Sequence, residues 1–120
     1  MLLFEPEVQL GEHTLVPDLA GWRREKLPKL PETNWISVPP DWIYEVLSPG
    51  TVRIDKNQKM PIYARFGVPY FWLIDPHNKI LDVFRLDAGK WTLLSSYTEN
   101  DRVRAEPFQE AEIDLALLWA

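Results

Sequence analysis

Two acidic residues stand where the core strand of a small protein would ordinarily carry apolar side chains. Asp18 lies in the run VPDLA, and Glu45 lies in the run IYEVL. Side chains alternate between the two faces of a strand, so Glu45 shares a face with Ile43 and Leu47. A carboxylate buried on such a face without a partner is costly. It must therefore reach water, pair with a base or bind a cation.

A second group of polar residues recurs every four positions, close to one helical turn. At this spacing Asp55, Lys59 and Tyr63 would share one face of a helix. Lys59 could form a solvated ion pair with Asp55, or its ammonium group could serve a site formed with other residues. Tyr63 could hydrogen-bond a polar partner such as Lys59, or it could only pack against a sheet.

These residues need two strands to position them. Leu15–Trp22 is predicted to be one strand, which Pro17 enters and Gly21 ends. Residues 23–40 are basic and then proline-rich, a composition that predicts a long loop. Trp42–Leu47 is dense in aromatic and β-branched residues and predicts a second strand.

The lysine needs a helix, which is predicted within residues 51–66 with Gly67 as a left-handed C-cap. Pro61 is unfavourable inside a helix, because it removes a backbone hydrogen bond and clashes with the preceding turn. We therefore expect a kink at Pro61 or a helix that begins near Lys59.

The rest of the chain predicts a meander of three strands, followed by a short apolar end at which Asp114 caps a last helical turn. The strands are Tyr70–Ile74, Ile80–Leu86 and Trp91–Tyr97, with a turn at Asp87–Lys90. The pattern predicts a single α+β domain over residues 1–120, a mixed sheet with one principal helix.

Composition narrows the class of protein further. The chain has no cysteine, which excludes disulfides and thiolate metal sites and favours the cytoplasm. It has neither the basic start of a signal peptide nor an apolar run long enough to span a membrane. The net charge of −5 argues against nucleic acid, but residues 22–65 hold eight of the 13 basic residues. This segment predicts either a DNA-facing surface or an ordinary solvated one.

Four motifs in order resemble the Uma-two family of endonucleases, within the PD-(D/E)xK superfamily of restriction-type nucleases. The motifs are VPDLAGWR around Asp18, PDWIYEVLSP around Glu45, the spaced Asp55, Lys59 and Tyr63, and GVPYFWLIDP at residues 67–76. The resemblance extends from about Phe4 to Trp119.

The resemblance implies a restriction-endonuclease-like fold and a metal-dependent endodeoxyribonuclease. Asp18 and Glu45, with the Val46 carbonyl, would bind Mg²⁺ or Mn²⁺, the hard cations that prefer oxygen ligands. Asp18, Glu45 and Lys59 would be the catalytic residues. The motif's usual lysine position holds Leu47, so Lys59 would reach in from the helix instead. Asp55, Tyr63 and Arg23 are candidates for supporting roles.

Relatives usually carry a further N-terminal segment with an acidic residue that completes the site. The chain is therefore expected to be an N-terminally shortened version of the fold, and to cover exposed apolar surface by forming a homodimer. The alternative is a catalytically inactive nuclease fold that acts as an interaction module or is a remnant. A glycosidase that uses Asp18 and Glu45 as acid and base is a third reading, which leaves Lys59 without a role.

Overall fold

The structure is a computed structural model that describes residues 1–47 and 52–119, except for the side chains of residues 52–57. A six-stranded mixed sheet forms its centre. In spatial order the strands are β1 (Leu2–Phe4), β4 (Leu19–Gly21), β5 (Trp42–Val46), β6 (Tyr70–Asp75), β7 (Ile80–Asp87) and β8 (Lys90–Thr98). Only β5 and β6 pair in parallel, and the principal helix α1 (Val52–Arg65) connects them. This arrangement confirms the expected α+β class.

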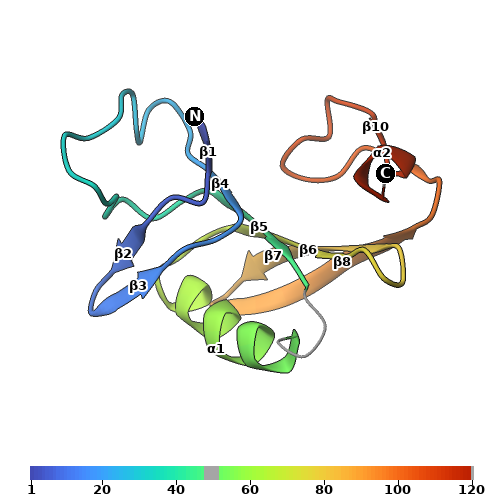
Figure 1. Ribbon diagram of the computed structural model, residues 1–120, viewed down its shortest axis with the longest axis horizontal. Coiled ribbons are helices and arrows are strands. Elements are labelled where there is room, and N and C mark those ends of the chain that lie inside the picture. The colour runs from blue at the N-terminus through green and yellow to red at the C-terminus, as the bar shows by residue number, and fades with distance from the viewer. Residues whose placement is uncertain (48–51, 120) are drawn as a thin grey trace.

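Smaller elements cover the two faces of the sheet. A hairpin of β2 (Val8–Leu10) and β3 (His13–Leu15) lies near α1, and the C-terminal segment carries β9 (Arg102–Val103), β10 (Ile113–Asp114) and α2 (Ala116–Trp119). Figure 1 shows α1 on one side of the sheet and the C-terminal segment on the other. Asp114 accepts a hydrogen bond from the Ala116 N–H at 3.1 Å, as the sequence predicts for a cap.

Each face of the sheet has its own apolar core. Ile43 and Phe71 point to the side of α1, where they pack with Met60 and Tyr63. Trp42, Trp72 and Ile74 point to the other side, where they pack against the C-terminal segment. Both faces of β6 are buried, which explains its nearly continuous apolar run.

The predicted strand Leu15–Trp22 is wrong as a single element. β3 ends at Leu15 and β4 begins at Leu19, with Pro17 buried in the break between them. Proline has no backbone N–H to donate and restricts the preceding residue, so the chain leaves the hairpin here and enters the central sheet. Asp18 therefore lies immediately before β4 rather than in mid-strand. The other predicted strands are confirmed to within about one residue at each end.

The helix begins well before Lys59, which contradicts a start at that residue. It continues through Pro61, whose side chain is exposed, so water can bond the carbonyl that the proline leaves unpaired. Gly67 has a φ of 77° and ends the helix as predicted. The Val68 N–H donates to the Tyr63 carbonyl at 3.0 Å, the bond expected when a left-handed glycine follows a helix.

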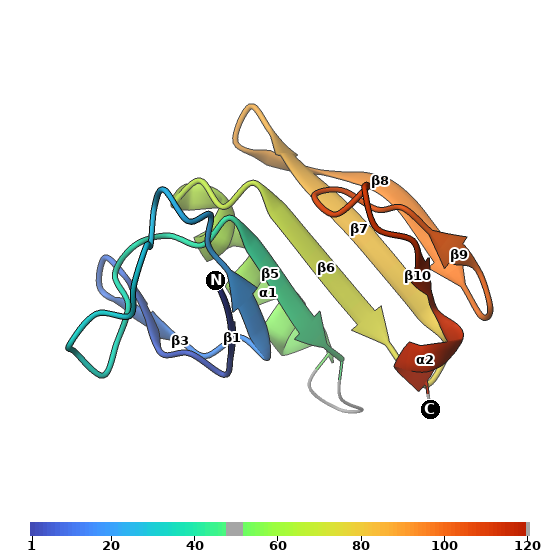
Figure 2. The same ribbon diagram turned by 90° about the horizontal axis from the view of Figure 1, so that it is seen from above.

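The long loop between β4 and β5 is confirmed, and Trp22 anchors it by donating its indole N–H to the Val38 carbonyl at 2.7 Å. Figure 2 shows this loop next to the start of β5, at the end of the strand opposite its arrowhead. Within the described ranges, no helix is long and apolar enough to span a membrane.

Candidate active site

The pairing of β4 with β5 brings Asp18 and Glu45 together. The strands are antiparallel, with Leu19 opposite Tyr44. Extending this register by one residue places Asp18 opposite Glu45, and opposite residues of an antiparallel pair share a face. That face is the one covered by α1. The two carboxylates, called the carboxylate pair below, therefore lie on the same side of the sheet.

Two reciprocal hydrogen bonds fix the carboxylate pair. The backbone N–H of Asp18 donates to Glu45 Oε1 at 2.9 Å. The backbone N–H of Val46 donates to Asp18 Oδ2 at 2.7 Å. Each carboxylate is thus held by a backbone N–H of the opposite segment. Hydrogen bonds from N–H groups to ionised carboxylates are among the stronger ones in proteins.

Lys59 completes the cluster from the helix. Its Nζ lies 3.0 Å from Glu45 Oε2, in an ion pair whose side chains are 27% and 8% exposed for Lys59 and Glu45. Glu45 is the one buried charged residue of the described part of the chain. The predicted ammonium group and the predicted carboxylate pair therefore meet at one place.

Burial has the largest effect on the pKa of Glu45. It raises the pKa of the Glu45 carboxyl, while the hydrogen bonds from Lys59 and from the Asp18 N–H, together with the charge of Lys59, oppose this rise. The negative charge of Asp18 adds to the rise. The net direction is upward, so Glu45 gives up its proton at a higher pH than an exposed glutamate.

Val46 and Leu47 follow Glu45 at the end of β5. The Leu47 N–H donates to the Ile74 carbonyl, on the side of β6. The N–H and C=O of one strand residue face the same neighbouring strand, so both groups of Val46 face Asp18. The Val46 carbonyl is therefore on the side where the sequence expects a third oxygen ligand, and Leu47 offers no ammonium group there.

Tyr63 is one helical turn beyond Lys59 and is fully buried. Its pKa is raised by burial first, and then by the negative charges of Glu45 and Asp18. The phenol therefore lies in the field of the carboxylate pair. The side chain of Asp55, the other predicted member of this helical series, lies outside the described residues.

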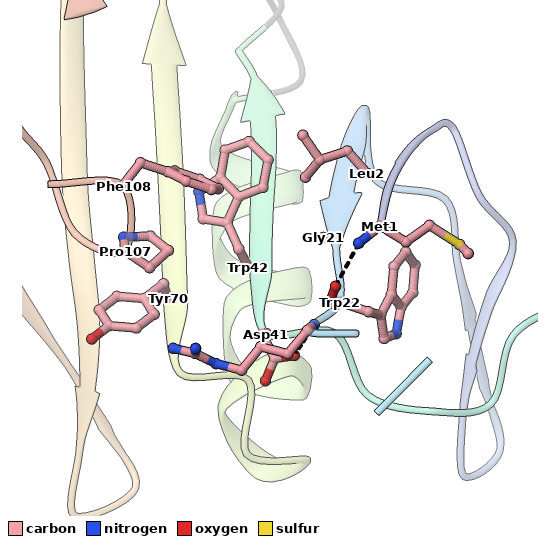
Figure 3. A pocket seen from close by; sticks show the side chains of 10 residues that line it. Met1, Leu2, Gly21, Trp22, Asp41, Trp42, Tyr70, Pro107 and Phe108 are labelled. Carbon is pink, nitrogen blue, oxygen red and sulfur yellow. Dashed lines mark hydrogen bonds between the residues drawn. The ribbon is translucent and has the colours of Figure 1, made fainter. Parts of the chain in front are cut away.

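Arg23 is not brought to the carboxylate pair. It follows β4, whereas Asp18 precedes it, and a strand rise of roughly 3.3 Å per residue separates them by on the order of 15 Å. Arg23 instead lines a cavity of about 250 Å³ at the far end of the sheet. Figure 3 shows Trp42, Tyr70 and Phe108 around this cavity. Asp18 and Glu45 are not in its lining, so this aromatic cavity is separate from the charged cluster.

The basic residues of segment 22–65 also lie in two separate places. Arg23, Arg24, Lys26 and Lys29 are exposed on the loop at the far end of the sheet. Lys26 pairs with Asp41 at 3.2 Å. Of the basic side chains in the described part of the chain, Lys59 alone contacts the carboxylate pair.

The donor groups of the cluster are two carboxylates, a backbone carbonyl and one ammonium group. No group of three or more acidic, histidine or cysteine side chains suited to a metal gathers among the described residues. The reciprocal backbone bonds could not be foreseen from residue types, because every residue except proline has an N–H. They follow from the register, which depends on where Pro17 breaks the strand.

Comparisons with known proteins place the chain in a family. A solved structure from Anabaena variabilis ATCC 29413, described as "a putative nuclease belonging to DUF820", shares the fold with a TM-score of 0.74 and 24% sequence identity. The match covers 98% of this chain and 66% of that one, so this chain spans just under two thirds of its length. No curated protein matches the chain.

The family model of Uma2, described as "Putative restriction endonuclease", matches residues 2–117. This range includes both strands of the carboxylate pair and the helix that carries Lys59. The predicted family resemblance is thereby confirmed, and the chain belongs to the Uma2 family.

Proposed function

We propose that Asp18, Glu45 and Lys59 form the catalytic centre of a Mg²⁺- or Mn²⁺-dependent endodeoxyribonuclease. The observation that carries this proposal is the position of Glu45. One of its oxygens is held by the backbone of Asp18 and the other by the ammonium group of Lys59. Two acids and one base thus converge on one spot from three different elements, β4, β5 and α1.

The donor set fits a hard divalent cation. Mg²⁺ typically takes one or two protein carboxylates and completes its shell with water and substrate phosphate oxygens. Asp18 and Glu45 would hold it, with the Val46 carbonyl facing the same side. A divalent ion bound here would polarise a phosphoryl oxygen and make a bound water more acidic.

The protein's own residues supply positioning and charge. The reciprocal backbone bonds orient both carboxylates, so little rearrangement is needed when phosphate arrives. Lys59 carries its positive charge on a flexible stem, and it can stabilise the negative charge that grows on the phosphoryl oxygens. Burial between the sheet and α1 keeps the surroundings of Glu45 dry, which strengthens these interactions.

The proposed substrate is DNA, and the proposed assembly is a homodimer. β1 lies at one edge of the central sheet, and its Leu2 and Phe4 side chains are 56% and 85% exposed. An edge strand with exposed apolar side chains favours pairing with a second copy. Light scattering should therefore give a dimer mass that Phe4→Lys reduces to that of a monomer, whereas a monomeric wild type would contradict the assembly.

Nicking of supercoiled plasmid DNA tests the activity. The wild type should nick with Mg²⁺ or Mn²⁺ and stop when EDTA is added. Lys59→Met should lose the activity, while Lys90→Met, which removes an exposed lysine at the start of β8, should retain it. Activity in Lys59→Met equal to the wild type would contradict the assigned role of Lys59.

One observation favours the non-catalytic alternative. Lys59 already balances the charge of Glu45 within the protein, and no third acidic side chain joins the carboxylate pair among the side chains that the structure describes. A cluster of this kind can serve as a structural ion pair. Absence of nicking with every divalent ion tested, together with absence of Mn²⁺ binding, would support a scaffold over an enzyme.

A further inference from the structure

The hydroxyl of Tyr63 has no explanation in packing alone. The side chain is fully buried, and its oxygen has no hydrogen-bond partner in the part of the chain that the structure describes. The ring packs against Phe71 with centroids 5.8 Å apart, a contact that phenylalanine would make equally well. A buried hydroxyl without a partner costs stability. Its presence therefore calls for a state of the protein in which it has one.

The position of Tyr63 on α1 points to Glu45 as the partner of its hydroxyl in that state. Tyr63 lies one turn after Lys59 on the face of α1 that packs on the sheet. The charges of Glu45 and Asp18 both raise its pKa, and Glu45 has the larger effect. The phenol thus lies on the same side of the sheet as the ion pair of Lys59 and Glu45, one helical turn from Lys59, and its hydroxyl bonds to neither residue.

Catalysis would disturb that ion pair. In the structure, Lys59 bonds Glu45 Oε2. If the proposed function holds, Lys59 must turn toward the phosphate to stabilise its developing charge, and this removes the donor from a carboxylate oxygen that is nearly buried. Leaving such an oxygen without a donor is expensive, because a nearly buried polar atom then has no hydrogen-bond partner.

We infer that the Tyr63 hydroxyl donates to Glu45 Oε2 whenever Lys59 leaves it. Tyr63 is then a positioning residue that acts through Glu45, and it contacts neither substrate nor metal. A neutral donor suits this role because it holds Glu45 in its orientation without adding positive charge that would repel a cation. The inference rests on the proposed function only for the reason that Lys59 moves.

A comparison of melting temperatures tests the exchange without requiring activity. In the wild type, Tyr63→Phe should leave the Tm unchanged or raise it, because it removes a hydroxyl that has no partner there. In Lys59→Met, where Tyr63 would already bond Glu45, the same substitution should lower the Tm by about 3–6 °C. Equal shifts in the two backgrounds would overturn the inference.

Plasmid nicking provides a second test, which also applies if Lys59→Met does not fold. Tyr63→Phe should slow nicking about tenfold without lowering the Tm, and Tyr97→Phe serves as the matched control. Nicking by Tyr63→Phe at the wild-type rate would overturn the inference while leaving the proposed function intact. A wild type that does not nick contradicts the proposed function instead, and the melting comparison then decides the role of Tyr63 by itself.

Discussion

Asp18 and Glu45 are joined through the backbone as well as by proximity, because the N–H of Asp18 donates to Glu45 Oε1 at 2.9 Å. The reverse bond, from the Val46 N–H to Asp18 Oδ2, closes the arrangement. Each acid is therefore oriented by the strand that carries the other. An amide in place of either carboxylate keeps an oxygen that can accept these bonds, so Asp18→Asn and Glu45→Gln change charge more than structure.

The ion pair of Lys59 and Glu45 predicts a pH-dependent loss of stability in Lys59→Met. Removing Lys59 raises the pKa of Glu45 further, since its hydrogen bond and its charge both lower that pKa. The loss should be absent below the ordinary glutamate pKa of about 4 and should grow as pH rises through the raised pKa. We expect about 1–3 kcal/mol at pH 7, measured by urea unfolding at pH 4 and pH 7.

The double variant Glu45→Gln/Lys59→Met is the control for this effect. It contains no buried charge at the site, so it should recover part of the stability that Lys59→Met loses at pH 7. A loss in Lys59→Met that is the same at both pH values would show that the lysine contributes through packing alone.

The raised pKa of Glu45 also predicts how metal affinity depends on pH. A cation competes with a proton for the carboxylate, so affinity should fall as pH is lowered through that raised pKa. The fall should begin at a higher pH than for an exposed glutamate, and should reach about tenfold per pH unit below the pKa. Titrations with Mn²⁺ at steps from pH 7.5 down to pH 4.5 measure it, and an affinity that stays constant over the whole series would be inconsistent with Glu45 as a ligand.

Exposed bases at the far end of the sheet predict a salt-dependent contribution to DNA binding. Arg24 and Lys29 are exposed and form no ion pair within the described residues. Replacing both with alanine should weaken DNA binding, and should reduce the slope of log affinity against log salt by about two. Fluorescence anisotropy over a salt series measures this slope. Unchanged binding would assign the basic loop to the solvated surface.

The helix end that positions Tyr63 and Lys59 predicts a sensitive glycine. Gly67 has a φ of 77°, and an added Cβ would meet no atom within 4 Å, so strain alone would act. Gly67→Ala should cost about 1–2 kcal/mol, and Gly67→Asn should cost less, because asparagine tolerates this conformation. Thermal unfolding of the two variants measures the difference, and an equal or smaller loss for alanine would contradict the strain argument.

The sequence was informative wherever periodicity or residue type determined the outcome. The apolar run of β6, the left-handed Gly67 and the turn before Lys90 all follow from local rules, and the structure agrees with them. The convergence of Lys59 with Glu45 was anticipated through the family resemblance. Arg23 was predicted as a supporting residue, but it lies away from the carboxylate pair. Side chains at opposite ends of one short strand cannot share a site.

Other features depended on tertiary structure that no local pattern shows. Pro17 marks a break between two strands rather than the start of one, since the chain has a hairpin to leave and a sheet to join. Pro61 remains inside a helix because packing of its neighbours Met60 and Tyr63 outweighs one missing backbone bond. The hydroxyl of Tyr63 became notable only once its burial and lack of a partner were known.

Isothermal titration with Mn²⁺ is the most direct measurement of the claim that Asp18 and Glu45 form one cation site. The wild type should bind one ion per chain, Asp18→Asn and Glu45→Gln should each abolish that binding, and Glu110→Gln, an exposed control, should bind as the wild type does. Binding that survives in either site variant, or a wild type that binds no ion, would contradict the account.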